Sequence, residues 1–234
     1  MDEIILIDKP AGMTSFGVVA RVRRVLSERD GKRVKVGHTG TLDPFATGLL
    51  IVLAGKATKR SNEFLKLDKE YVAEIKLGET STTGDPEGEI KETFDEKTGK
   101  IPSSEEVKRA LEKFKGEIFQ RVPIFSAVKI NGERAYKLAR KGKEFTPPER
   151  KVKIYELEIL EYEFPKLKIR AKVSSGTYIR TLGEDIGKEL KTGAFLMGLR
   201  RTKIDKYRVE DAKKLEDFMG ERSEREGHDF CTSH

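Results

Sequence analysis

The sequence predicts an α+β protein in which strands and helices follow one another in mixed order. Three observations support this prediction: apolar runs of strand length, apolar residues at helical spacing after Ser or Thr caps, and two alternating runs around Pro165. With 234 residues the chain can bury one large core, as a single domain or a domain with a small appendage.

The N-terminal segment predicts a strand followed by a helix. Residues 4–7 form a short apolar run, and Thr14 or Ser15 can then cap a helix that ends at Gly31. The apolar residues that share one face of this helix are Val18, Val22, Val25 and Leu26. Its arginines fall largely on the outer side.

The next segment predicts two strands and two helices. Residues 49–54 indicate a buried strand, the segment after Gly55 a basic helix, and residues 71–77 a further strand. The Gly, Pro and Asp residues of 84–88 indicate a loop. Ser103 and Glu106 form a capping box that opens a helix with Val107, Ala110, Leu111 and Phe114 on one face.

The second half begins with strand patterns. Residues 125–130 lead into a turn at residues 131–132, followed by a short basic segment. The apolar alternation of residues 152–159 slips in register midway, which predicts a long bent strand. Residues 167–173 alternate in the same way, so the two runs predict a hairpin around Pro165.

The C-terminal segment predicts a helix, then an extended region. After Gly176 the inward face of the helix is formed by Ile179, Leu182, Ile186 and Leu190. Residues 194–209 are expected to be extended and basic, and residues 221–234 form a polar tail.

Composition favours a polyanionic partner. Lys and Arg number 47 against 40 Asp and Glu, which gives a net charge of +7 and a pI near 9.3, so nucleic acid ranks ahead of membrane. One cysteine and three scattered histidines offer no spacing for a structural metal site or a disulfide. The sequence shows no secretory signal or apolar membrane span, so the expected compartment is the cytoplasm.

The candidate site is the loop VGHTGTLDPFATG, residues 36–48, which contains one carboxylate, Asp43. Its glycines allow sharp turns and close approach of a ligand, while His38 and two threonines offer hydrogen bonds beside the acid. Asp followed by Pro is also ordinary turn chemistry, so Asp43 needs partners elsewhere in the chain to define a site.

Several motifs supply a context. GHTGTLDPFATG, KEYVAEIKLGETSTTGD, SSGTYIR and LRRT occur in that order, with DKPAGMTS before them and PIFSAVKINGERAYKLARKG in the middle. Together they resemble the TruB family of tRNA pseudouridine synthases, and the resemblance extends from about residue 4 to about residue 209. It implies a large mixed, mainly antiparallel sheet flanked by helices, with a central RNA-binding cleft.

The resemblance also implies a reaction. Family members isomerise the uridine at position 55 of the tRNA T loop to pseudouridine, without metal or cofactor, after flipping the base from its stack. Asp43 matches the carboxylate that acts as nucleophile or base. The sequence leaves open whether Asp43 attacks the base, attacks C1′ or removes a sugar proton.

The other site residues are also implied by the resemblance. Tyr71 would stack on the flipped base and assist proton loss, and Arg180 would pair with Asp43 and keep it ionised. Tyr178 and Leu199 would line the uracil pocket, and His38 would contact RNA. The candidate phosphate contacts are Lys9, Arg140, Arg200 and Arg201. Without the resemblance, each of these residues has an ordinary structural interpretation as core, packing or surface charge.

The expected organisation is a catalytic domain over residues 1–209, with a thumb-like RNA-binding insertion at about residues 120–150. A short helix and tail at residues 210–234 stand where the family usually has a C-terminal RNA-binding domain. The insertion favours a stand-alone bacterial type, a monomer that needs no obligate protein partner or membrane. Two alternatives stay open: a tRNA-folding chaperone that binds the tRNA elbow, and a guide-RNA-dependent subunit.

Overall fold

The computed structural model describes residues 2–126, 128–130, 132–135, 138 and 145–220. It divides into two compact units, formed by residues 1–69 with 200–234 and by residues 70–199. Two strands have residues in both units: β4 (Lys69–Leu77) and β12 (Ala194–Ile204). None of the helices in the described part of the chain is long and apolar enough to cross a membrane.

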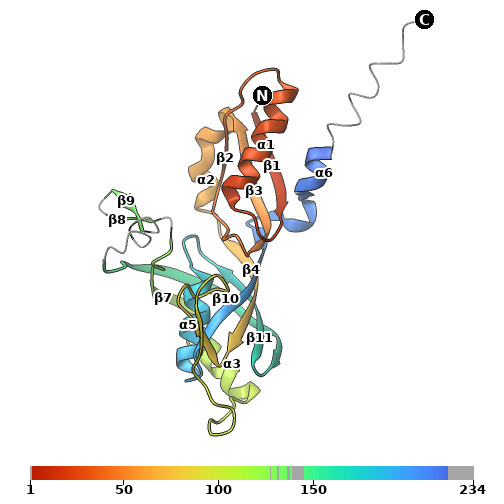
Figure 1. The fold of residues 1–234 in the computed structure, drawn as a ribbon. Coiled ribbons are helices and arrows are strands. Elements are labelled where there is room, and N and C mark those ends of the chain that lie inside the picture. The colour runs from red at the N-terminus through yellow and green to blue at the C-terminus, as the bar shows by residue number, and fades with distance from the viewer. Residues whose placement is uncertain (1, 127, 131, 136–137, 139–144, 221–234) are drawn as a thin grey trace, which may run out of the picture. The chain divides into compact units, whose positions relative to one another are not determined.

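The first unit contains helices on a sheet whose strand order is β14-β1-β3-β12, with β2 paired to β3 and β13 to β12 (Figure 1). Its other elements are β1 (Asp2–Lys9), α1 (Ser15–Arg29), β2 (Val36–His38), β3 (Thr47–Gly55), the 3₁₀ helix η1 (Lys56–Arg60), α2 (Ser61–Leu65), β13 (Tyr207–Arg208), η2 (Val209–Asp211), β14 (Lys213–Lys214) and α6 (Leu215–Gly220). The β1–β3 pair is antiparallel, whereas β3 runs parallel to β12.

The second unit continues the strand order as β12-β4-β11-β10-β7. Its other elements are β5 (Glu79–Ser81), β6 (Ile90–Glu92), α3 (Ser104–Glu112), β7 (Gly116–Arg121), β8 (Lys129–Ile130), β9 (Glu133–Arg134), β10 (Glu149–Glu163), β11 (Lys166–Val173) and α5 (Ile179–Glu189). The long antiparallel hairpin β10–β11 is its largest strand pair (Figure 1). The fold is therefore α+β, with a mixed and mainly antiparallel sheet flanked by helices.

Strand β3 organises the core of the first unit because both of its faces are buried. Leu50, Val52 and Ala54 pack with the apolar face of α1 and with β1. Leu49, Ile51 and Leu53 face the other way, toward Phe64 and Ile204. A strand covered on both sides reads as a continuous apolar run, which explains why it is visible in the sequence. The loop that carries Asp43 leads directly into this rigid strand.

Most expected elements are confirmed, including both helix caps. Thr14 accepts a hydrogen bond from Gly17 N at 3.0 Å, and the Ser103–Glu106 capping box has both of its bonds. The helix expected after Gly55 begins with a 3₁₀ turn. Of the described residues in the strand expected over residues 125–130, only the last two form a strand, β8, and the expectation is wrong for the others.

Candidate active site

Asp43 lies in the loop between β2 and β3, where its side chain is half-buried. The loop is tied to its own strand at one end, because Thr39 N donates to Ile51 O over 3.1 Å. It is closed locally at the other end by the bond from Ala46 N to Asp43 O, also 3.1 Å. Asp43 is therefore presented by a short, internally bonded loop rather than by a loose connection.

Lys9 lies below this loop and is fully buried. Its ammonium donates to three backbone carbonyls, those of Pro10 at 2.8 Å, Met13 at 2.6 Å and Pro44 at 3.1 Å. Burial lowers the pKa of Lys9 to about 8, and the negative charge of Asp43 opposes that shift. The phosphate contact expected of Lys9 is not what the structure shows: its cation supports the loop from inside.

Arg201 is also internal, with 1% of its surface exposed. Its guanidinium donates to Leu49 O at 2.7 Å and to Gly40 O at 3.1 Å, so it joins β3 to the Asp43 loop. Gly48, with φ of 103°, passes so close that a Cβ would lie 2.3 Å from Arg201 O. Arg201 thus also acts within the fold, contrary to the expected phosphate contact.

The remaining basic candidates differ from these two. Arg200 is 42% exposed and forms a bidentate pair with Asp8, at 2.8 and 3.1 Å. It lies where a phosphate can reach it, so its phosphate contact stays a prediction. Arg140 lies outside the described residues.

His38 ends β2 beside an exposed aromatic side chain. The ring of Phe16, which is 60% exposed, packs edge-on against the imidazole with 5.0 Å between ring centroids. Nδ1 of His38 accepts a hydrogen bond from Gly40 N at 3.4 Å. The histidine is therefore oriented by its neighbours, and its role toward RNA stays a prediction.

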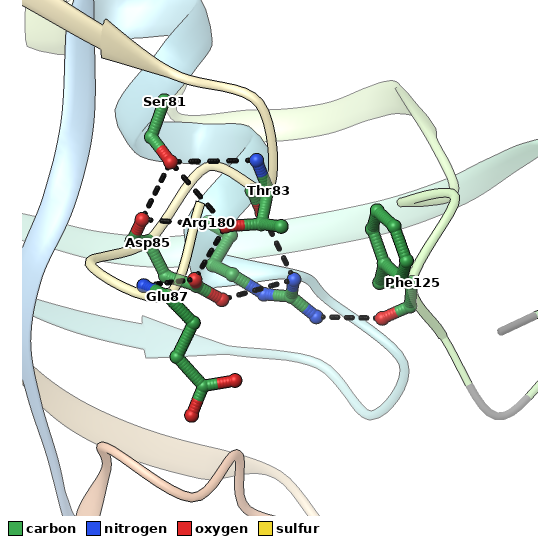
Figure 2. Close-up of polar contacts among 6 residues, drawn as sticks. All are labelled: Ser81, Thr83, Asp85, Glu87, Phe125 and Arg180. Atoms are coloured by element: carbon green, nitrogen blue, oxygen red, sulfur yellow. Dashed lines mark hydrogen bonds and ion pairs between the residues drawn. The ribbon is translucent and has the colours of Figure 1, made fainter. Parts of the chain in front are cut away.

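In the second unit, Arg180 lies in the first turn of helix α5 and is buried among acceptors (Figure 2). Nη1 donates to Asp85 Oδ2 at 3.2 Å and to Thr83 O at 3.0 Å, and Nη2 donates to Phe125 O at 2.9 Å. These bonds fix the plane of the guanidinium. Its expected pairing with Asp43 joins the two units and stays a prediction.

Asp85 is a residue that the sequence analysis did not single out. Its Oδ1 accepts from Thr83 Oγ1 at 2.6 Å and from Glu87 N at 3.1 Å, which leaves Oδ2 for Arg180 (Figure 2). Nearby, burial raises the pKa of Glu184 despite the opposing charges of Lys188 and Arg180. The signal for Asp85 in the sequence was an acid inside a Gly-rich loop that belongs to one of the motifs.

The residues expected around the uracil lie on separate elements of the second unit. Tyr71 is buried on β4, while Tyr178 and Leu199 are half-buried. The fully buried Gln120 holds the backbone of Tyr178 from both sides: its amide donates to Tyr178 O at 3.2 Å, and its oxygen accepts from Tyr178 N at 3.0 Å. Gln120 therefore fixes the N-cap residue of helix α5, two positions before Arg180.

In the described part of the chain, no group of three or more His, Cys, Asp or Glu residues is placed to hold a metal. A cavity of about 620 Å³ in the second unit is lined by Phe94, Arg109 and Leu190 among others. It contains none of the predicted site residues.

Comparison with known proteins identifies close relatives of the chain. The model of the TruB family pseudouridylate synthase (N terminal domain) matches residues 23–179. A tRNA pseudouridine synthase B from Phocaeicola vulgatus is 46% identical over 217 residues, which cover 92% of this chain and 91% of that one. The protein of the same name from Aquifex aeolicus is 45% identical over 229 residues, 97% of this chain and 76% of that one.

Two solved structures contain longer chains with the same fold. The chain is similar to one in a crystal structure of a Cbf5-Nop10-Gar1 complex, with a TM-score of 0.70 and 33% identity over 93% of its length. A second match is the structure of an H/ACA RNP bound to a substrate RNA containing 2′-deoxyuridine, with a TM-score of 0.69 and 30% identity. The chain spans about half of these two proteins, 53% and 56%.

Proposed function

The chain belongs to the TruB family of pseudouridylate synthases, and we propose that it isomerises a uridine of tRNA to pseudouridine, at position 55 of the T loop. The observation that carries the proposal is the Asp43 loop, supported from inside by Lys9 and Arg201 within the first unit. Relatives that are 44–48% identical over most of the chain and named tRNA pseudouridine synthase B support the choice of tRNA.

The reaction is a rearrangement within one nucleotide. The bond from N1 of uracil to C1′ of ribose breaks, a bond from C5 to C1′ forms, C5 loses its proton and N1 gains one. Neither an oxidant nor a second substrate is needed, so the demand on the protein is a placed carboxylate and a base held out of its stack. Asp43 is half-buried on a constrained loop and fits that demand.

The other roles follow from the same proposal. Tyr71 would stack on the flipped base and assist proton loss from C5, while Tyr178 and Leu199 would line the uracil pocket. Arg180 would pair with Asp43 and keep it ionised when RNA excludes water. The contacts that orient Arg180 are already made within its own unit, which supports a preorganised role.

The first test is direct. Purified protein is incubated with a tRNA transcript labelled with tritium at C5 of uridine, and tritium release is measured together with the position of pseudouridine. We expect release from position 55 alone and its loss in Asp43→Asn. The matched control is Asp30→Asn, another half-buried carboxyl of the first unit, which should remain active. Substantial activity in Asp43→Asn would overturn the role of Asp43.

We further propose that the chain acts alone, as a monomer in the cytoplasm, with the segment at about residues 120–150 gripping the T loop. The observation that favours the competing function, a guide-dependent subunit, is the similarity at 30–33% identity to chains of a Cbf5-Nop10-Gar1 complex and of an H/ACA RNP. The higher identity to proteins named tRNA pseudouridine synthase B supports the first choice. A bare T-arm stem-loop separates the two, because a guide-dependent subunit would leave it unmodified.

A further inference from the structure

A single hydroxyl group holds the peptide that precedes Asp43. Ser15 Oγ donates to Leu42 O at 3.0 Å and accepts from Leu42 N at 2.8 Å. Both residues are buried, with 1% of Ser15 and 4% of Leu42 exposed. One side chain therefore satisfies both backbone polar groups of Leu42, as a neighbouring strand would do in a sheet.

Ser15 stands on a rigid support. It is the first residue of α1, whose buried face is formed by Val18, Val19, Val22 and Leu26. The preceding residue, Thr14, makes the cap of this helix, because its hydroxyl accepts from Gly17 N. The two adjacent hydroxyl residues thus have separate tasks: Thr14 serves the helix, and Ser15 serves the loop.

The other side of Asp43 is held by the same segment of chain. Pro44 O accepts hydrogen bonds from Gly12 N at 2.9 Å and from the ammonium of Lys9. Residues 9–15 therefore grip the backbone both before and after the carboxylate. Of these contacts, the two hydrogen bonds of Ser15 are the ones that hold both the N–H and the C=O of a single residue next to Asp43.

We propose that Ser15 is a positioning residue for the isomerisation, an inference that rests on the proposed function. It touches no substrate, but it fixes the Leu42 backbone and through it the direction of the Asp43 side chain. Loss of the hydroxyl leaves a buried N–H and a buried C=O without a partner, and the loop must shift to hydrate them. A displacement of about 1 Å at a reacting group can reduce a rate roughly 100-fold.

The test compares Ser15→Ala with Thr14→Ala, which removes the neighbouring hydroxyl and weakens the same helix without touching the loop. At saturating tRNA we expect the single-turnover rate constant of Ser15→Ala to fall roughly 10- to 100-fold, with an unchanged dissociation constant for tRNA. Thr14→Ala should keep the rate of the wild type. If Ser15 acts only by stabilising the helix, the reaction should be slowed to the same extent in both variants.

Amide hydrogen exchange reports on the loop without any reaction. The Leu42 amide should exchange faster in Ser15→Ala, while those of Val22 and Leu26 within α1 keep their protection. Equal single-turnover rate constants for Ser15→Ala and Thr14→Ala would overturn the inference. A Leu42 amide that stays protected in Ser15→Ala would also overturn it. Should Ser15→Ala fail to fold, Ser15→Cys replaces it, because a thiol of similar size weakens both bonds. A wild type that makes no pseudouridine defeats the proposed function instead, and the exchange measurement still decides whether Ser15 holds the loop.

Discussion

Arg180 Nη1 lies 3.2 Å from Asp85 Oδ2, and the two side chains are only 6% and 5% exposed. A buried ion pair gains little net stability, because both charges lose their water, but removing one partner leaves the other uncompensated. Arg180 also donates to the carbonyls of Thr83 and Phe125, so its position is fixed by two segments of the second unit, the loop that holds Thr83 and Asp85 and the segment at Phe125. The pair therefore sets the orientation of a cation that we place in the active site.

Asp85→Asn keeps the shape of this side chain and removes its charge. We expect the free energy of unfolding to fall by about 3 kcal/mol, because Arg180 stays buried without a counter-ion, and tritium release to fall with it. Asp95→Asn is the control, since Asp95 makes the same type of loop contacts, to Lys97 N and Thr98 Oγ1, at an exposed position. Equal effects of the two substitutions would contradict a special role for the Arg180 pair.

Lys9 gives a prediction about pH. The unfolded chain holds the Lys9 proton up to about pH 10.5, whereas the folded protein releases it near a pKa of about 8. Between these values the unfolded state binds more protons, so the contribution of Lys9 to stability rises with pH, by about 1.4 kcal/mol per unit at most. The unfolding free energy of the wild type minus that of Lys9→Met should therefore increase from about pH 8 to pH 10.

Urea unfolding at several pH values checks this difference. Lys32→Met, at an exposed position of the same unit, is the matched control for the removal of a lysine side chain. If the unfolding free energy of the wild type minus that of Lys9→Met stays constant or decreases with rising pH, burial does not lower the pKa of Lys9.

Alanine substitutions at two glycines of the Asp43 motif distinguish a steric clash from the ordinary effect of adding a methyl group. Gly48 has a φ of 103°, and a Cβ there would lie 2.3 Å from Arg201 O, so Gly48→Ala must displace β3 from β12. We expect a loss of roughly 3 kcal/mol or more in urea unfolding. Gly37 has open space around its Cβ position, and Gly37→Ala should change stability by less than about 1 kcal/mol. Similar losses would contradict the close approach of Arg201.

The fold was predictable where its signals are local. The Ser103 capping box and the register slip of β10, at Ile154/Glu156, depend on residues close together in sequence. Strand β7 was missed because its pattern is inverted: Phe119 is 68% exposed, while Gln120 is fully buried. Gln120 is buried because its amide bonds the backbone of Tyr178, a long-range contact that no hydropathy pattern encodes.

The site was predictable only in part, for a related reason. Asp43 is recognisable as a lone acid among glycines, but Lys9 and Arg201 look like surface cations in the sequence. Their true setting requires carbonyls from distant segments to converge, such as Pro44 O on Lys9 and Gly40 O on Arg201. The fold supplies the partners of a buried charge, so its role emerges only from the structure.

Among the basic candidates that the structure describes, Arg200 is the one whose charge can reach RNA. We expect Arg200→Gln to weaken tRNA binding severalfold at low salt and to reduce the slope of log K against log salt concentration by about 1, the loss of one phosphate contact. Arg60→Gln is the control, because Arg60 is similarly exposed and pairs with Glu63 as Arg200 pairs with Asp8. Filter binding over a salt series measures both slopes. If Arg60→Gln changes the slope as much as Arg200→Gln, the effect is general charge, and the specific phosphate contact of Arg200 is wrong.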